Sequence, residues 1–503
     1  MTKIGLEIHC QLTNLQSKLF CPCKANYREF GINENICPIC MGLPGSLPRL
    51  NQEAVKKATM IAMALNCSTP DKIAFFRKNY FYPDLPKNFQ ITQLNIYGDT
   101  SIGGTGSIMV GDKKINITRI QLEEDPGRLI YEGSSSKNLI TLVDYNRAGT
   151  PLVEIVTEPD FENPKQVREF LNILSDLLEN LGVSDPGLEG AMRADANVSI
   201  EGGKKVEIKN IGSFHDLEKA TIFEITRQES LHSRDIEIAQ ETRHWDDKRK
   251  ITVSSRSKEE ESDYRYFLEG DIPWVLIDSE TKEKIENEMP TSMEDQQRHY
   301  VEQLQMQPQV AHVISTSRTD AKFFGNCLAT CSPEYSQSIG VSTQQHTTQH
   351  THTHLPPTNT TYSNATIVRS NELSNMMTTD MKSYSNYDQI KLDKNFEKDI
   401  GKLIDDLSEK KITRNSAKSI LSEMFEKKTP YSELFSELSL EISTDESELL
   451  EIIKQVISEE SKAVEEAKSN PQTINYLVGK VMQKTKGQAD PAQTLDLLKK
   501  QIG

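Results

Sequence analysis

Apolar and polar residues alternate strictly near the start of the chain. In the run GLEIHCQL, Leu6, Ile8 and Cys10 take one face of an expected strand, while Glu7 and His9 share the other. Similar spacings recur around six further charged residues in stretches rich in β-branched residues: Glu124, Glu154, Arg193, Asp195, Glu207 and Lys209. This pattern predicts an open sheet that carries a charged site.

A helical period first becomes clear after Pro164. Apolar residues from Val167 to Leu181 recur on one face of an expected helix. Asn163 is a suitable N-cap, Pro164 fits the first turn and Gly182 fits the exit. We therefore expect a helix over residues 164–181 whose apolar stripe packs against the sheet.

Beyond Met289 the β pattern ends and helical periods follow. Four apolar stripes repeat at helical spacing: Phe396–Leu407, Ala417–Met424, Leu449–Ile457 and Ile474–Val481. Together the two patterns predict an α+β protein. We expect a mixed α/β domain with an open sheet at 1–290, a helical linker domain at 291–395 and a small helical tail at 396–503.

One tract inside the helical half differs in composition. Residues 331–362 are dominated by Ser, Thr, Gln and His, and Glu334 is the only formal charge. Such a composition favours disorder or a long surface loop. Its four clustered histidines could bind a transition metal, although a His cluster in a polar tract is usually incidental: His346, His350, His352 and His354.

Length and charge narrow the class of protein. A chain of 503 residues is too long for one compact core, and a length prior gives roughly three domains. With 58 basic and 74 acidic residues the net charge is −16, which argues against a simple electrostatic nucleic-acid binder. Any contact with a polynucleotide must therefore be local. A cluster of lysines near the C-terminus could form such a contact or could simply be a solvated face: Lys480, Lys484, Lys486, Lys499 and Lys500.

The opening residues lack a signal-peptide pattern, and no apolar run approaches the length of a membrane span. We therefore expect a cytoplasmic protein with no membrane partner, in which the eight cysteines do not form disulfides.

Four of those cysteines form two close pairs. Cys21 and Cys23 enclose one residue, and thirteen residues separate them from Cys37 and Cys40, which enclose two. Two such knuckles suit a tetrahedral Zn²⁺ site with Zn–S distances of about 2.3 Å, although the first spacer is shorter than usual. Four thiolates leave no open position, so a zinc ion would hold the loop rather than perform chemistry. The alternative is four free thiols.

A second constellation combines one imidazole with carboxylates. Glu7, His9, Glu124 and Glu154 would form a hard, oxygen-rich site suited to Mg²⁺ or Mn²⁺. A carboxylate at Glu154, inside the apolar run TPLVEIV, needs a compensating charge. That charge comes either from a divalent cation or from nearby arginines, and spacing alone does not decide: Arg119, Arg128 and Arg147.

The loop at residues 77–93 interleaves aromatic and cationic residues, among them Arg77, Lys78, Tyr80 and Tyr82. This composition suits stacking on a base and holding a phosphate or a carboxylate. The same loop could instead cap a sheet edge.

Ordered motifs along the chain resemble one known family, the B subunits of the aspartyl/glutamyl-tRNA(Asn/Gln) amidotransferases (the GatB/GatE family). The resemblance covers about residues 1–290 and runs from Asn364 to the end, and it is carried by these segments: GLEIHCQL, ICPICMGLPGSLP, FRKNYFYPDLPKNFQITQ, LEEDPG, DYNRAGTPLVEIVTEPD, MRADANVSI, VEIKNIGSF, QETRHWD, DYRYF and NYLVGKVMQKTKGQADP.

The resemblance implies a ligase that corrects misacylated tRNA. Members of this family bind Glu-tRNA(Gln) or Asp-tRNA(Asn) and phosphorylate the side-chain carboxylate with ATP. Ammonia from the A subunit, a glutaminase, then displaces the phosphate, in a heterotrimer that the C subunit completes. The chain itself shows no glutaminase signature. A zinc-stapled, tRNA-binding scaffold without catalysis is the alternative function.

The resemblance also implies roles for individual residues. Glu7, His9, Glu124 and Glu154 are implied as magnesium ligands, with Glu123 able to hold a second cation. Three further residues are implied to line the same pocket, the first as a contact for phosphate or the acyl group: Lys78, Arg193 and Asp195. The implied architecture is a cradle-shaped α+β domain, a helical domain and a helical tail that contacts the outer body of tRNA.

The chain departs from the family pattern in two places. The Ser/Thr/Gln/His tract occupies a position where relatives have helical-domain sequence. In DYRYFLEGDIP, Leu268 and Gly270 stand where the family tends to have proline, which puts the local turn in question.

Overall fold

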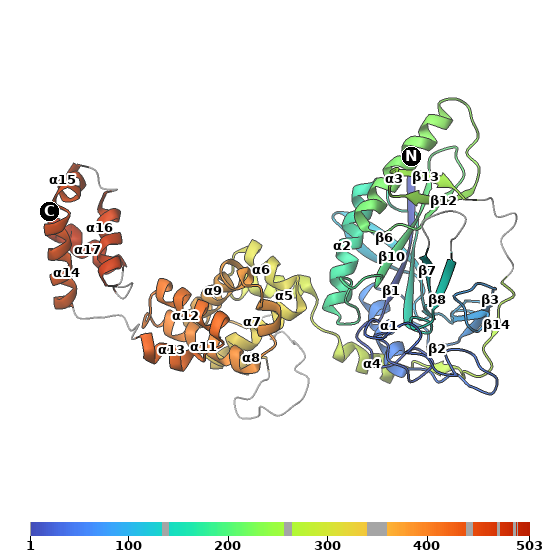
Figure 1. Cartoon of the computed structure of the whole chain (residues 1–503), viewed down its shortest axis with the longest axis horizontal. Helices are drawn as coiled ribbons and strands as arrows, with labels where there is room; N and C mark the ends of the chain where they lie inside the picture. Colours follow the sequence, from blue (N-terminus) through green and yellow to red (C-terminus); the bar gives the residue numbers. More distant parts are fainter. Residues whose placement is uncertain are drawn as a thin grey trace. The chain divides into compact units, whose positions relative to one another are not determined.

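The computed structural model describes residues 2–132, 140–255, 264–339, 360–438, 446–469, 473–485, 489 and 491–502. The chain forms two compact units, Met1–Pro290 and Thr291–Gly503 (Figure 1). The first combines a mixed sheet with helices and the second is helical, which confirms the expected α+β class. Among the described helices, none has both the length and the apolar character needed to cross a bilayer.

An eight-stranded sheet organises the first unit. In spatial order its strands are β13 (Ile251–Ser254), β12 (Glu241–Asp246), β11 (Val206–Lys209), β10 (Met192–Ser199), β1 (Lys3–Gln11), β9 (Pro151–Thr157), β6 (Lys113–Glu124) and β5 (Gly106–Val110). The β11–β12 pair is parallel, and the other neighbours are antiparallel. The N-terminal strand β1 therefore lies inside the sheet, between two strands that are both distant from it along the chain.

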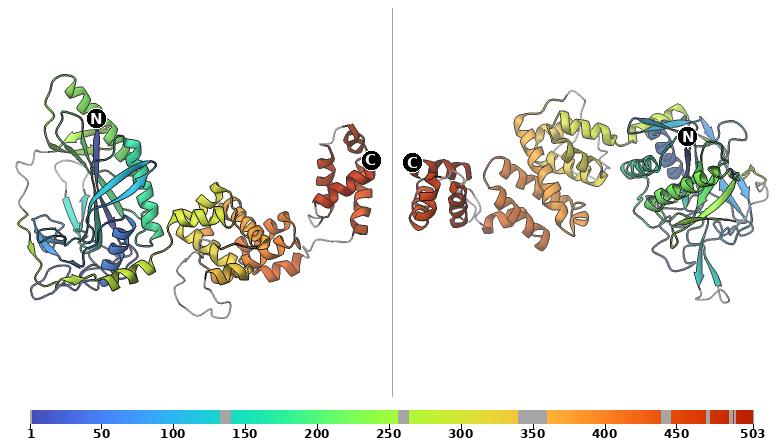
Figure 2. Two further views of the ribbon diagram at one scale, coloured as in Figure 1. Left: turned by 180° about the vertical axis from the view of Figure 1, so that it is seen from behind. Right: turned by 90° about the horizontal axis from the view of Figure 1, so that it is seen from above.

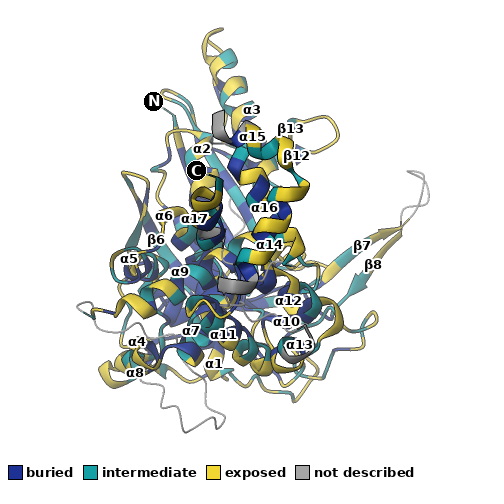
Figure 3. Cartoon of the chain, turned by 90° about the vertical axis from the view of Figure 1, so that its left-hand side faces the viewer, coloured by how far each residue is buried: buried dark blue, intermediate teal, exposed yellow. Residues whose placement is uncertain are grey.

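Three smaller β elements surround this sheet. β3 (Phe76–Asn79) pairs with β4 (Phe89–Thr92) and β14 (Phe267–Leu268), and β2 (Lys72–Ile73) pairs with β15 (Val275–Leu276). The hairpin of β7 (Arg128–Glu132) and β8 (Ile140–Asp144) extends away from the rest of the unit, and its side chains are largely exposed (Figure 3). Leu268 lies in β14 opposite Phe76, so the departure from the family pattern still forms a strand there.

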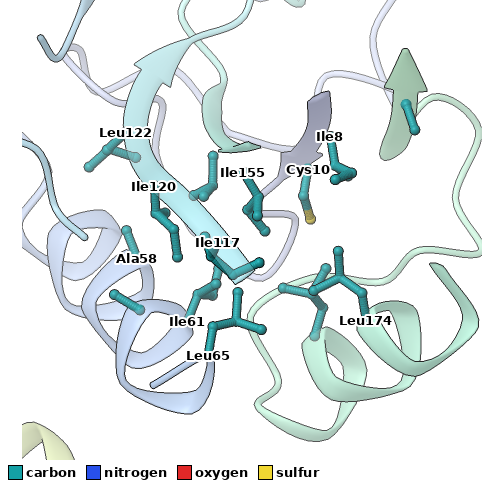
Figure 4. Packing of buried hydrophobic residues seen from close by; sticks show 14 of the residues in the cluster. Ile8, Cys10, Ala58, Ile61, Leu65, Ile117, Ile120, Leu122, Ile155 and Leu174 are labelled. Atoms are coloured by element: carbon teal, nitrogen blue, oxygen red, sulfur yellow. The ribbon is translucent and has the colours of Figure 1, made fainter. Parts of the chain in front are cut away.

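One face of the large sheet is apolar and carries the core. Residues Ile4, Leu6, Ile8 and Cys10 of β1 are buried in a single cluster with apolar residues of β6, β9 and β10. Helices α1 (Gln52–Ala64), α2 (Pro164–Asn180) and α3 (Phe214–His232) supply the other side of this cluster (Figure 2). Figure 4 shows residues of α1 and α2 in this packing. Helix α4 (Ser279–Glu288) completes the unit and contacts α1.

Helix α2 confirms the prediction over residues 164–181 almost to the residue. Asn163 caps it by accepting a hydrogen bond from the backbone N–H of Gln166 at 3.1 Å, and Pro164 occupies the first turn. Most of the predicted stripe is buried, including Val167, Phe170 and Leu174, while Leu177 is partly buried. Local periodicity was sufficient to predict this helix, because the face that the helix buries is the one on which its sequence places apolar residues.

The second unit consists of helices throughout its described part. They are α5 (Met293–Glu302), α6 (Pro308–Ser315), α7 (Arg318–Cys331), α8 (Pro333–Ser338), α9 (Asn364–Thr379), the 3₁₀ turn η1 (Met381–Ser383), α10 (Tyr387–Ile390), α11 (Lys394–Ser408), α12 (Arg414–Lys427), α13 (Tyr431–Leu438), α14 (Glu446–Glu459), α15 (Ser461–Ser469), α16 (Ile474–Lys484) and α17 (Pro491–Ile502).

The hydrophobic cores of this unit do not divide at residue 395. One cluster of buried residues runs from Tyr300 to Leu434, and a separate one runs from Leu449 to Leu498. Helix α11 packs against α7 and α9, so the helices at 394–438 share the core of the preceding helices. Helices α11, α12 and α13 thus belong to the same buried cluster as the helices before residue 395, whereas α14, α16 and α17 contribute to the other cluster.

The polar tract at 331–362 is not a loop from its first residue. Residues Pro333–Ser338 form α8, in which Tyr335 is buried, and Tyr362 is buried near the start of α9. These aromatic residues anchor both ends of the tract in the helical core. Residues 340–359, with the four clustered histidines, lie outside the described part of the chain.

Candidate active site on the polar face of the sheet

The face of the sheet opposite the core is lined by charged side chains. Strand pairing places His9 of β1 directly opposite Glu154 of β9 on one side and Arg193 of β10 on the other. Glu7 lies opposite Asp195 in the same way. Because side chains alternate along each strand, the core residues between them point to the other face. The predicted charged face is therefore present.

Three of these side chains converge on one point. His9 Nε2 lies 3.6 Å from Glu7 Oε1 and 3.7 Å from Glu154 Oε2. One ligand atom from each of Glu7, His9 and Glu154 lies within 4.8 Å of the others, an arrangement that could hold a metal ion. Glu123 Oε1 is 3.9 Å from the same imidazole nitrogen. We call Glu7, His9, Glu123 and Glu154 the acidic cluster.

Burial and mutual repulsion perturb the ionisation of this cluster. Burial, followed by the charge of Glu154, raises the pKa of Glu123 to about 7 and also raises the pKa of Glu7. Burial by itself would lower the pKa of His9, but the carboxylates of Glu154, Glu123 and Glu7 outweigh it and raise that pKa to about 9. The concentrated negative charge is what a cation would relieve.

The structure does not bring Glu124 into the acidic cluster. Glu124 follows Glu123 in β6, so its side chain points to the opposite face. There its carboxylate accepts from Lys87 Nζ at 2.5 and 2.6 Å and from the Ile91 backbone N–H at 2.8 Å. The carboxylate beside His9 is that of Glu123, and not that of Glu124, which was expected there.

The Lys87–Glu124 pair lines a separate pocket of about 230 Å³. Its walls also include Cys21 and Cys40 of the cysteine loop, together with Arg77. Arg77 is itself held by a bidentate contact of 2.5 and 2.8 Å to Glu269, whose side chain is almost fully buried. The sequence could not pair Lys87 with Glu124, because the two residues lie 37 positions apart.

An arginine helps to offset the negative charge of the acidic cluster. Arg119 Nη2 lies 3.3 Å from Glu154 Oε1. Together with His9 and Lys78, Arg119 opposes the effect of burial, so that the pKa of Glu154 is lowered. Arg147 instead lies 3.7 Å from Asp125. Within the acidic cluster, Glu154 thus contacts an arginine through Oε1, while His9 Nε2 faces one oxygen each of Glu7, Glu123 and Glu154.

Arg193 and Asp195 lie on the same face but make their closest contacts elsewhere. Arg193 donates to Asp125 at 3.0 Å, and Gln11 donates to the same carboxylate at 2.6 Å. Asp195 lies 3.5 Å from Lys209 Nζ, which also pairs with Glu207 at 2.9 Å. The charged face therefore continues beyond the acidic cluster into a network across β10 and β11.

Lys78 lies at the edge of the acidic cluster on β3. Burial opposes its charge, but Tyr266, Glu123, Tyr264 and Glu154 outweigh that effect and raise its pKa. The ammonium group of Lys78 and the carboxylates of Glu123 and Glu154 therefore act on each other's charge. The tyrosines at 264 and 266 had a signal in the sequence, the DYRYF motif, to which no role was assigned.

The four predicted cysteines form the second candidate metal site. Cys21, Cys23, Cys37 and Cys40 each offer a sulfur atom within 4.8 Å of the others, so the cluster could hold a metal ion. Hydrogen bonding from Cys21 and the charge of Lys18 oppose burial and lower the pKa of Cys40 to about 5. Lys18 is fully buried, and its Nζ donates to Asn35 O at 2.9 Å and to Cys40 Sγ at 3.9 Å.

The chain is similar to one family of known proteins over most of its length. A family model described as the GatB/GatE catalytic domain matches residues 2–283, and one described as a GatB domain matches residues 361–502. Proteins named as the B subunit of aspartyl/glutamyl-tRNA(Asn/Gln) amidotransferase are 42% identical in Sulfolobus acidocaldarius, 40% in Saccharolobus solfataricus and 41% in Sulfurisphaera tokodaii. Each alignment covers 100% of both chains.

The match to the catalytic-domain model spans more than half of the chain and contains both candidate metal sites. The chain therefore belongs to the GatB/GatE family, whose members include the B subunits of aspartyl/glutamyl-tRNA(Asn/Gln) amidotransferases.

Proposed function

We propose that the chain is the activating subunit of a glutamine-dependent amidotransferase that converts Glu-tRNA(Gln), Asp-tRNA(Asn) or both to the correctly amidated form. The observation that carries this proposal is the acidic cluster of Glu7, His9, Glu123 and Glu154, with Lys78 at its edge. A carboxylate substrate is a poor acyl donor until one of its oxygens is phosphorylated. A site that combines a cation-binding cluster with a fixed ammonium group suits that step.

The donor set of the cluster fits a hard divalent cation. Glu7, His9 and Glu154 supply two carboxylates and one imidazole from two adjacent strands, and Glu123 adds a third carboxylate. Bound there, Mg²⁺ or Mn²⁺ would neutralise charge on ATP and on the attacking carboxylate. Glu123 would hold or orient a second cation, since it approaches His9 from β6, the strand on the far side of β9.

The chemistry then consists of two displacements. An oxygen of the substrate carboxylate attacks the γ-phosphorus of ATP and ADP leaves, which forms an acyl phosphate. Ammonia attacks the acyl carbon, and phosphate leaves with both electrons of its C–O bond. Lys78 would contact the transferred phosphoryl group or the acyl oxygen, and Arg193 and Asp195 would line the approach to the site.

The second metal site would be structural. Four thiolates close the coordination of a zinc ion, so zinc at Cys21, Cys23, Cys37 and Cys40 would fix the loop that lines the pocket beside Lys87 and Glu124. We expect this loop to lose its fold when a chelator removes the metal.

The reaction requires partners. Because the sequence shows no glutaminase signature, ammonia would come from an A subunit with glutaminase activity. A C subunit would complete a heterotrimer. The helical tail near the C-terminus, with Lys480, Lys484 and Lys499, would contact the outer body of tRNA, where recognition depends on shape as well as on base edges.

Release of phosphate by the assembled heterotrimer tests the proposal. With ATP, Mg²⁺ and misacylated tRNA, the wild-type complex should release phosphate, and correctly charged tRNA should not support release. Glu154→Gln should reduce the rate by at least about a hundredfold, whereas Glu158→Gln, at an exposed position just beyond β9, should not. A complex that amidates tRNA at the wild-type rate with Glu154→Gln would instead favour the scaffold function.

A further inference from the structure

Lys78 is surrounded by tyrosine rings rather than by carboxylates. Its Nζ lies 4.9 Å from the ring centroid of Tyr264 and 5.7 Å from that of Tyr80. Tyr264 packs edge-to-face on Tyr80 at 5.8 Å and on Tyr266 at 6.0 Å. Within the described part of the chain, no carboxylate oxygen forms an ion pair with Lys78 at 4.0 Å or less, although Glu123 and Glu154 act on its charge.

The backbone fixes these rings at that place. Strand β14 pairs with β3, and Phe267 lies opposite Arg77 in the register. Just before this pairing, the Asn79 backbone N–H donates to Tyr264 O at 3.0 Å, and Asn79 Nδ2 donates to Arg265 O at 2.8 Å. The segment 264–266 is therefore held beside β3, with half-buried tyrosines on either side of an exposed arginine.

Aromatic faces and carboxylates hold an ammonium group in different ways. A carboxylate accepts its hydrogen bonds and neutralises it, whereas an aromatic face attracts the charge and leaves the N–H groups free. A lysine side chain is long and flexible, so without the rings the ammonium group could turn onto Glu123 or Glu154. Paired in that way it would offer less to a phosphate oxygen.

We propose that Tyr264 and Tyr266 are positioning residues for Lys78, and that Tyr264 acts through its aromatic face. They keep the ammonium group beside the acidic cluster but not paired with it, so that it remains available to an incoming phosphoryl or acyl oxygen. This inference rests on the proposed function for its catalytic consequence, but the position of Lys78 can be tested without any activity.

The kinetic test uses the assembled heterotrimer and tRNA-dependent phosphate release. Tyr264→Leu removes the ring and should lower kcat roughly tenfold with a smaller change in KM, the size of effect expected from a partly desolvated cation–π contact. Tyr264→Phe keeps the ring and should stay within about threefold of wild type. Tyr131→Leu, which removes an exposed tyrosine on the β7–β8 hairpin, serves as the control.

A double-variant cycle separates positioning from general packing. In the Lys78→Met background, Tyr264→Leu should cause no further loss of kcat, because the group on which the ring acts is gone. If the two losses multiply instead, the ring does not act through Lys78 and the proposal is overturned. Tyr266→Leu repeats the cycle at the neighbouring ring, which keeps the test decisive if Tyr264→Leu does not fold.

Chemical labelling reads the position of Lys78 directly. Mass spectrometry of the complex after brief acetylation gives the rate at Lys78, and Lys24, whose amine lies over Phe30, is an internal reference. Tyr264→Leu should slow acetylation of Lys78 several-fold, because the ammonium group then pairs with Glu123 or Glu154, which stabilises its charged form, and Tyr264→Phe should leave the rate unchanged. An unchanged rate in Tyr264→Leu overturns the proposal. If wild-type complex releases no phosphate, the proposed function fails, while labelling still decides the position of Lys78.

Discussion

Replacing Lys87 with methionine should destabilise the first unit strongly. Lys87 and Glu124 form an ion pair in which the side chains are only 10% and 6% exposed. The carboxylate accepts from Lys87 at 2.5 and 2.6 Å, and the Ile91 N–H alone would remain after the substitution. Breaking a buried pair by removing one partner costs about 3–5 kcal/mol, because the other charge is left uncompensated.

The assay is thermal unfolding followed by tryptophan fluorescence. The chain has two tryptophans, Trp245 and Trp274, and both lie in the first unit. A loss of about 4 kcal/mol should lower the Tm of this transition by roughly 10 °C. Lys87→Met/Glu124→Gln should recover at least half of that loss, since neither charge then remains buried.

An exposed pair provides the matched control. Lys113 lies near Glu162 at 2.6 Å, but the glutamate side chain is 64% exposed, so Lys113→Met should cost under about 1 kcal/mol. If Lys87→Met costs no more than Lys113→Met, the Lys87–Glu124 pair does not hold a buried charge, and the placement of Glu124 away from the acidic cluster is refuted.

Glu154→Gln should raise the Kd for Mn²⁺, measured by calorimetry, at least about tenfold. Glu124→Gln should leave this Kd within about threefold of wild type. Equal losses of affinity in the two variants would show that Glu124 is also a ligand of the ion. Lys18→Met should speed the release of zinc to a chelator about tenfold or more, since the buried ammonium group that offsets the thiolate charge near Cys40 is removed; an unchanged rate would show that it offsets nothing. Burial lowers the pKa of His299 to about 4, so the folded state binds a proton at this imidazole less readily than the unfolded chain does. The free energy of unfolding should therefore fall as the pH falls from about 6.5 to 4, by about 3 kcal/mol at pH 4. His299→Leu should remove that part of the pH dependence in urea titrations of the chain followed by circular dichroism, and a variant with the wild-type dependence would contradict the assignment.

Elements with a strong local period could be predicted from the sequence. The helix from Pro164 and the alternation in β1 both appeared where expected, because each buries a face that its own residues define. The two cysteine pairs also came together as expected, since the short loop between them suffices to join them. The core that the helices at 394–438 share with earlier helices could not be predicted in this way, because α11 packs on α7, which lies much earlier in the chain.

The acidic cluster shows most clearly what local pattern leaves open. Adjacent residues of a strand point to opposite faces, so the sequence determined that Glu123 and Glu124 cannot both reach Glu154. Which of the two does so depends on the pairing of β6 with β9, and that register shifts between Ile117 and Arg119. Long-range pairing sets this register, and a single-residue slip exchanges the two glutamates, so only the tertiary structure could decide which carboxylate lies beside His9.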